Sequence, residues 1–76
     1  MKSVNIKLST IEDVKAFVNA VTQYNGDADL SSGRYIVDAK SIMGIFSLDL
    51  ANPIALTVHG DNADELLNNL KNYIVD

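Results

Sequence analysis

The chain has 76 residues, of which 47% are hydrophobic, and a formal net charge of −4. This length predicts a single domain, residues 1–76, with one modest core, and the apolar content favours a folded chain over a disordered one. The absence of cysteine excludes disulfides and thiolate metal sites, and the few scattered basic residues argue against nucleic-acid binding. We find neither an apolar run that would span a bilayer nor a signal peptide, so we expect a cytoplasmic protein that does not bind membranes.

A strand and a helix are expected at the start of the chain. Val4, Ile6 and Leu8 alternate with polar residues, which is typical of a half-buried strand. Ser9 is then expected to cap a helix, with Glu12 as its capping-box partner. The apolar face of this helix would comprise Ile11, Val14, Phe17, Val18, Val21 and Tyr24.

Two strands are expected next. Asn25-Gly26 is predicted to stop the first helix, because glycine tolerates the left-handed conformation. Residues 27–31 form a short strand with Ala28 and Leu30 inward, and Ser32-Gly33 turns the chain. Residues 34–39 form the next strand. Its predicted inward residues are Tyr35, Val37 and Ala39.

The second half of the chain is expected to add a helix, a strand and a helix. Ser41 is predicted to cap a short helix that ends near Leu50, and residues 54–58 alternate as a strand. Asp61 is predicted to cap the last helix. The apolar face of that helix would comprise Ala63, Leu66, Leu67, Leu70 and Ile74.

The element order is therefore βαββαβα, and each strand has one polar face. A sheet with one wet face is covered by helices on the other face only, which predicts an α+β open-faced sandwich. The predicted core comprises Val4, Ile6, Phe17, Val21, Leu30, Val37, Leu56, Val58, Leu66 and Leu70.

The segment Lys40-Ser41-Ile42-Met43-Gly44-Ile45-Phe46-Ser47-Leu48 resembles the region around the regulatory serine of HPr, the phosphocarrier protein of the bacterial sugar phosphotransferase system. Residues 17–24 resemble the second half of the first helix of that family, and residues 27–30 resemble its second strand. The resemblance implies a four-stranded antiparallel sheet under three helices, with strand order first-fourth-second-third.

The HPr family carries phosphate on a histidine at the start of its first helix, in a His-Ala-Arg-Pro context. An ungapped alignment puts Thr10 at the histidine position, Glu12 at the arginine and Asp13 at the proline. The segment from Ser9 to Asp13 is therefore interpreted as a degenerate phosphocarrier site, whose two carboxylates would repel a phosphoryl group at the helix N-terminus.

His59 is the one histidine of the chain, and the pattern places it on the wet face of the fourth strand. A lone histidine without cysteine or a second histidine is a poor metal site. We expect no catalytic residue, no metal and no cofactor.

The resemblance makes Ser41 a candidate for regulatory phosphorylation, since its counterpart in the family is phosphorylated by a dedicated kinase. Lys40 adds a positive neighbour, and a helix N-cap is a favourable place for phosphate. The residues that match Met43 and Phe46 form an exposed patch in the family that contacts partner proteins. We therefore expect the partner-binding surface on the second helix, with Lys40, Met43 and Phe46 as its contact residues. If the interface lies elsewhere, we expect it on the first helix beside Lys15 and Asn19.

Two functions remain open from the sequence. The first is a non-enzymatic regulatory or adaptor protein that contacts phosphotransferase-system or transcription-regulatory proteins and carries no histidine phosphate. The alternative is a phosphocarrier that uses a non-standard acceptor, Thr10 or His59. The sequence does not decide the oligomeric state.

Overall fold

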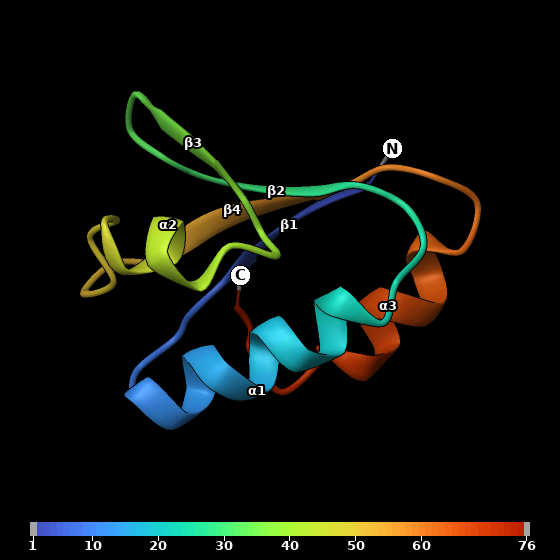
Figure 1. Ribbon diagram of the computed structural model, residues 1–76, viewed down its shortest axis with the longest axis horizontal. Helices are drawn as coiled ribbons and strands as arrows, with labels where there is room; N and C mark the ends of the chain where they lie inside the picture. Colours follow the sequence, from blue (N-terminus) through green and yellow to red (C-terminus); the bar gives the residue numbers. More distant parts are fainter. Residues whose placement is uncertain (1, 76) are drawn as a thin grey trace.

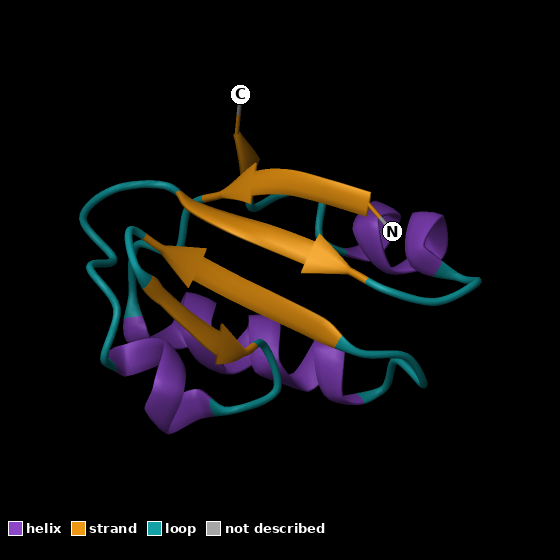
Figure 2. Ribbon diagram, turned by 90° about the horizontal axis from the view of Figure 1, so that it is seen from above, coloured by secondary structure: helices purple, strands orange, loops and turns teal. Residues whose placement is uncertain are grey.

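The structure, a computed structural model, describes residues 2–75 as one antiparallel sheet with three helices packed on one face (Figures 1 and 2). The elements are β1 (Lys2–Ile6), α1 (Ile11–Thr22), β2 (Ala28–Ser32), β3 (Tyr35–Asp38), α2 (Ile42–Phe46), β4 (Ile54–Val58), α3 (Ala63–Asn69) and β5 (Ile74–Val75). The strand order is β3-β2-β4-β1-β5, which confirms the predicted neighbours of the first four strands. Among residues 2–75, no helix combines the length and apolar character required to cross a membrane.

The sheet has five strands, so the prediction of four was wrong. α3 ends at Asn69, and the chain then turns back so that Asn5 lies opposite Val75 and Ile6 opposite Ile74. The expectation that Ile74 lies on the last helix was therefore wrong. The asparagines near the end of α3 are weak helix formers, and the open edge of β1 pairs with the β-branched Ile74 and Val75.

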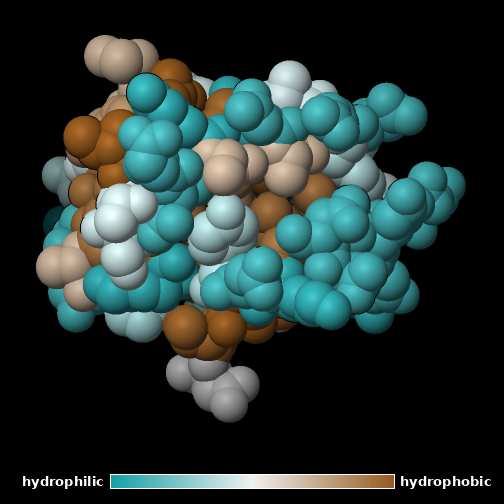
Figure 3. All heavy atoms as spheres, turned by 90° about the horizontal axis from the view of Figure 1, so that it is seen from below, coloured by the Kyte–Doolittle hydropathy of each residue, from teal (hydrophilic) through white to brown (hydrophobic). Residues whose placement is uncertain are grey.

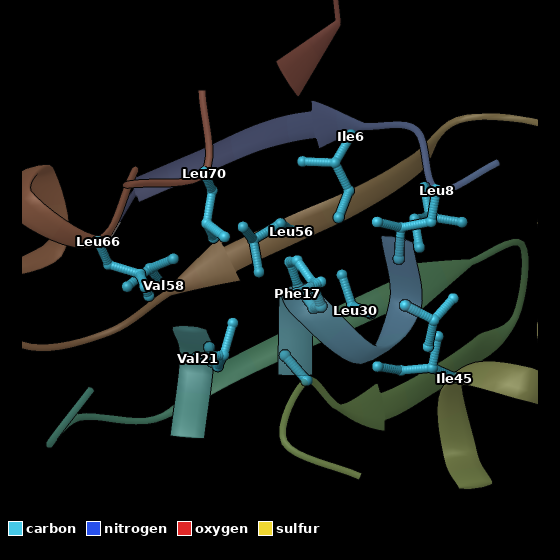
Figure 4. Packing of buried hydrophobic residues seen from close by; sticks show 14 of the residues in the cluster. Ile6, Leu8, Phe17, Val21, Leu30, Ile45, Leu56, Val58, Leu66 and Leu70 are labelled. Carbon is cyan, nitrogen blue, oxygen red and sulfur yellow. The ribbon is translucent and has the colours of Figure 1, made fainter. Parts of the chain in front are cut away.

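The core lies between the sheet and the helices (Figure 4). Phe17 projects from the middle of α1 and is fully buried. Eight of the ten predicted core residues are buried, whereas Val4 and Val37 are half-buried and pack against the cluster. The buried residues are Ile6, Phe17, Val21, Leu30, Leu56, Val58, Leu66 and Leu70.

The opposite face of the sheet is the wet face that the alternation predicted. Ser3 and Thr57 are cross-strand neighbours on β1 and β4, and their hydroxyl oxygens lie 3.1 Å apart. We call this surface, which is not covered by helices, the open face.

Three predictions for the part of the chain after β2 were wrong. Tyr35 was expected inward but is 72% exposed, because it sits at the tip of the β2–β3 hairpin, beyond the short α2. α2 ends at Phe46 rather than near Leu50, and Ser47 follows as its C-cap. Asp61 does not cap α3; the N-cap is Asn62, whose side chain makes no capping hydrogen bond.

Gly26 does not stop α1 in the way predicted. α1 ends at Thr22 with Gln23 as C-cap, and Gly26 is not among the glycines with positive φ. Glycine is needed there for space instead, since a Cβ would lie 2.5 Å from the carbonyl oxygen of His59 and 2.7 Å from the Tyr24 ring.

Candidate functional site

The start of α1 is closed by a capping box that differs from the predicted one. Thr10, not Ser9, is the N-cap, and Asp13, not Glu12, is its partner. The Asp13 backbone N–H donates to Thr10 Oγ1 over 3.0 Å. In return, the Asp13 carboxylate accepts from the backbone N–H groups of Ser9 and Thr10, at 3.1 and 3.2 Å. The cap falls one residue later than expected because Thr10 still has an extended backbone, with φ −131° and ψ 164°.

This geometry decides what the helix N-terminus can bind. Unpaired N–H groups and the positive end of the helix dipole ordinarily attract an anion. Here the Asp13 carboxylate already accepts two of the N–H groups at this end of the helix, and Glu12 adds a second negative charge in the first turn. A phosphoryl group at this position would be repelled by the two carboxylates and would find fewer free N–H donors.

Lys7 does not offset these carboxylates through a contact. Its ammonium group donates to the carbonyl oxygens of Leu50, at 3.0 Å, and of Ala51, which ties the end of β1 to the loop before β4. Leu50 and Ala51 help to line a groove of about 340 Å³ between the start of α1 and α2. The apolar side chains that line this groove are Leu8, Ile11, Phe46, Leu50 and Ala51.

Ile11 belongs to this exposed groove and not to the core. It was placed on the apolar face of the first helix, yet 61% of its surface is exposed. Helical spacing alone does not separate this first-turn position from the buried positions Val14, Phe17 and Val21. Its position in the same groove as Phe46 makes it a candidate contact residue that the sequence analysis did not single out.

Ser41, Met43 and Phe46, which the resemblance to HPr singled out, lie on α2 or at its N-cap. Ser41 is exposed and is the N-cap of α2, and its Oγ accepts the backbone N–H of Gly44 at 3.2 Å. Met43 is 79% exposed and Phe46 44% exposed, whereas Ile45 is fully buried. Seen from the helical side, apolar groups gather toward α2, and the surface at the other end, over the end of α1 and the start of α3, is mostly polar (Figure 3).

Two other candidate contact residues, Lys15 and Asn19, are exposed one turn apart on α1. Lys40 differs from them. Its ammonium donates to the carbonyl oxygen of Tyr24 at 2.8 Å, in a partly buried position at the end of α1 where a cation also complements the helix dipole. Lys40 is thus half-buried, with its ammonium group engaged by the Tyr24 carbonyl.

His59 lies far from the start of α1. It follows β4, whose last residue Val58 is opposite Lys2 at the beginning of β1, whereas Thr10 comes after the end of β1. Its Nε2 lies 3.3 Å from the Asp29 carboxylate on the open face, and both side chains are more than one third exposed. Within residues 2–75, no group of three or more histidine, cysteine or acidic side chains has metal-site geometry.

A larger hollow of about 770 Å³ between the end of α1 and the start of α3 was not predicted. Its polar side chains are amides, carboxylates and the phenol of Tyr24; Gln23 and Glu65 are examples of the first two, and the lining contains no basic group. The sequence gives no signal for it, since the two segments that form it are about 40 positions apart. The residues that line this hollow do not include a serine, threonine or cysteine nucleophile beside a histidine or lysine base.

Comparison with known proteins places the whole arrangement in one family. The family model described as "PTS HPr component phosphorylation site" matches residues 13–76. No curated protein matches the chain by sequence. Among solved structures, HPr-C-His from Thermoanaerobacter tengcongensis aligns with a TM-score of 0.83 and 28% identity, over 95% of this chain and 89% of that one.

Two Bacillus proteins are also similar. The phosphocarrier protein HPr from Bacillus anthracis is 31% identical with a TM-score of 0.75, over 97% of this chain and 94% of that one. Crh, the catabolite repression protein of Bacillus subtilis, is 28% identical with a TM-score of 0.70, over 92% of this chain and 82% of that one, and was crystallised as an intertwined, domain-swapped dimer. The chain belongs to the HPr family of the phosphotransferase system.

Proposed function

We propose that this HPr-family protein carries no histidine phosphate and acts, without catalysis, as a regulatory or adaptor protein through contacts made by α2 and the start of α1. The observation that carries the proposal is the Thr10–Asp13 capping box. In it, a carboxylate of the chain accepts the N–H groups of Ser9 and Thr10, in a segment that contains no imidazole.

The residues that remain at the site do not support phosphoryl transfer. A threonine phosphate is a stable ester that does not pass its phosphoryl group on as a phosphohistidine does. His59 has an imidazole, but it lies at the opposite end of the sheet and on the open face, beside Asp29. These placements favour the adaptor function over a phosphocarrier with a non-standard acceptor.

The contact surface that we propose is an apolar patch, which comprises Ile11, Met43 and Phe46. All three are exposed large hydrophobic side chains, and exposed apolar groups of this size are typical of binding sites. Ile11 and Phe46 line one groove, while Met43 lies on the same short helix as Phe46. The partners that we propose are phosphotransferase-system or transcription-regulatory proteins, in keeping with the family.

Ser41 is the proposed regulatory position next to this patch. A phosphate there would lie two residues from Met43, with the Gly44 N–H within reach of the present Oγ. Such a group changes the charge at the edge of an apolar contact and therefore changes affinity.

The experiment compares capture of partner proteins from a bacterial lysate by the immobilised wild-type chain and by variants. The double variant Met43→Ser/Phe46→Ser is expected to reduce capture, and Ser41→Asp to alter it, with the fold intact by circular dichroism. Lys71→Ser, an exposed change in the turn between α3 and β5, is the control. Unchanged capture by both test variants, with loss on Lys15→Glu/Asn19→Asp, would move the interface to the outer face of α1.

A further inference from the structure

The pair Asn25-Gly26 lies in the connection between α1 and β2. Asn25 is exposed and Gly26 is half-buried. Any other residue at position 26 would place a Cβ 2.5 Å from the carbonyl oxygen of His59. The packing therefore requires a glycine directly after an exposed asparagine.

The two groups of this pair that can react with each other are not held by hydrogen bonds. Within residues 2–75, the Asn25 side-chain amide forms none, and the Gly26 backbone N–H donates none. By contrast, the side-chain amide of Asn52 donates to the Asp49 carboxylate at 2.9 Å. Glycine also lacks a Cβ, so its nitrogen is unhindered and its backbone reaches conformations that other residues avoid. The Asn25 side-chain carbon and the Gly26 nitrogen are thus free to meet.

We propose that Asn25 is a site of spontaneous deamidation. The Gly26 main-chain nitrogen attacks Asn25 Cγ, and the new C–N bond closes a succinimide ring. The bond from Cγ to Nδ2 breaks, and Nδ2 leaves as ammonia together with the proton from the Gly26 N–H. Water then opens the ring at either carbonyl, with no oxidation or reduction. The products are aspartate and isoaspartate, in which the main chain runs through the former side-chain carbon.

The surroundings of Asn25 supply the water and determine what the new charge meets. Asn25 lines the larger hollow between the end of α1 and the start of α3, together with Asp61 and Glu65. Ring opening adds a third carboxylate to this lining, which contains no basic group. Like charges repel, so both products are expected to be less stable than the original chain.

The isoaspartyl product also lengthens the main chain between Tyr24 and Gly26 by one carbon. Contacts on both sides hold this segment in place. The Tyr24 carbonyl accepts from the Lys40 ammonium at 2.8 Å, and the Tyr24 phenol donates to the His59 carbonyl, against which Gly26 also packs. An extra main-chain atom displaces part of this set. We therefore expect the isoaspartyl chain to be the less stable of the two products.

The test incubates the full chain at mildly alkaline pH in water labelled in its oxygen atom, followed by peptide mapping with mass spectrometry. Asn62 and Asn72 are controls within the chain, because both are exposed but precede residues with side chains, Ala63 and Tyr73. We expect Asn25 to gain labelled oxygen at least about tenfold faster than either control, a barrier lower by about 1.4 kcal/mol. An isoaspartate-specific methyltransferase should label the same peptide.

A variant and a peptide separate the effect of the fold from that of the dipeptide. Asn25→Gln keeps an amide but moves its carbon one methylene further from the Gly26 nitrogen, and is expected to abolish the fast reaction. The synthetic peptide acetyl-QYNGDAD-amide, which corresponds to residues 23–29, gives the rate of an unconstrained pair. A folded chain that keeps Asn25 intact while the peptide reacts, or equal rates at Asn25 and Asn62, would overturn the proposal.

Thermal unfolding tests the expected effect on the fold. The isoaspartyl chain, purified by ion exchange, is compared with the variant Asn25→Asp, which has the same charge and an unaltered main chain. We expect Asn25→Asp to melt below the wild type and the isoaspartyl chain to melt lower still. Equal Tm values for the isoaspartyl chain and Asn25→Asp would contradict the argument from the contacts of Tyr24 and Gly26.

Discussion

Removing the Asp13 carboxylate tests whether the start of α1 is held by the chain itself. Asp13→Ala deletes the acceptor of the Ser9 and Thr10 N–H groups, at 3.1 and 3.2 Å, and a negative charge in the first turn of a 12-residue helix. The variant keeps the Thr10 hydroxyl, which still accepts the N–H of residue 13. It therefore isolates the half of the capping box that occupies the anion position.

The expected loss follows from the contacts. Loss of a capping side chain costs about 0.5–2 kcal/mol, and a carboxylate near a helix N-terminus contributes about 0.3–1 kcal/mol at exposed sites. The two effects overlap in one group, so we expect Asp13→Ala to lower the free energy of unfolding by about 1.5 kcal/mol. For a domain of this size that corresponds to a fall in Tm of about 6–12 °C.

Urea denaturation followed by circular dichroism measures this loss. Glu12→Ala is the matched control, because it removes the neighbouring charge of the same turn, which accepts no hydrogen bond within residues 2–75. It is expected to stay within about 0.5 kcal/mol of wild type. Asp13→Asn keeps an oxygen acceptor and should fall between the two. Equal stability of the Asp13→Ala and Glu12→Ala variants would refute the capping-box argument.

Three further substitutions test other parts of the structure. Gly26→Ala forces a Cβ against the His59 carbonyl at 2.5 Å and should cost about 1–3 kcal/mol, measured by thermal unfolding. Phe17→Ala removes the largest buried side chain and should lower the free energy of unfolding by about 3–5 kcal/mol, measured as a large fall in the urea midpoint. Lys40→Met deletes the hydrogen bond to the Tyr24 carbonyl, at 2.8 Å, and should cost about 1 kcal/mol; an unchanged urea midpoint would show that this contact contributes nothing.

Local patterns were sufficient for much of the fold. The alternation through Val4 and Ile6 located β1, and the helical spacing around Phe17 located α1, because each pattern reports one buried face of a regular element. The polar face of β4 also placed His59 on the open face, where it pairs with Asp29.

Features set by distant parts of the chain were not predictable in this way. β5 has two residues, too few for a periodic signal, and exists because its partner β1 offers an open edge. The two lysine contacts are similar cases, since Lys40 reaches a carbonyl 16 positions away and Lys7 one 43 positions away. The sequence placed Lys40 among the partner-contact candidates and gave no sign of its bond to the Tyr24 carbonyl.

The candidate site was likewise predictable from the sequence only in part. The proposed replacement of the family's His-Ala-Arg-Pro motif was readable from the residues between Ser9 and Asp13. Which of them form the cap was not, because serine and threonine are both good N-caps and the backbone conformation decides between them. The exposure of Ile11, in the first turn of α1, is set by tertiary packing, which no local pattern records.

Phosphate transfer is the most direct test of the claim that the start of α1 no longer carries phosphate. The chain is incubated with phosphoenolpyruvate and the first enzyme of the phosphotransferase system, with the Bacillus anthracis phosphocarrier protein HPr as the positive control. Intact mass spectrometry and ³¹P NMR then report covalent phosphate. We predict that the control gains an acid-labile phosphate and that this chain gains none. Acid-labile phosphate on His59, or phosphate on Thr10 that passes on to a sugar-specific acceptor domain, would contradict the account.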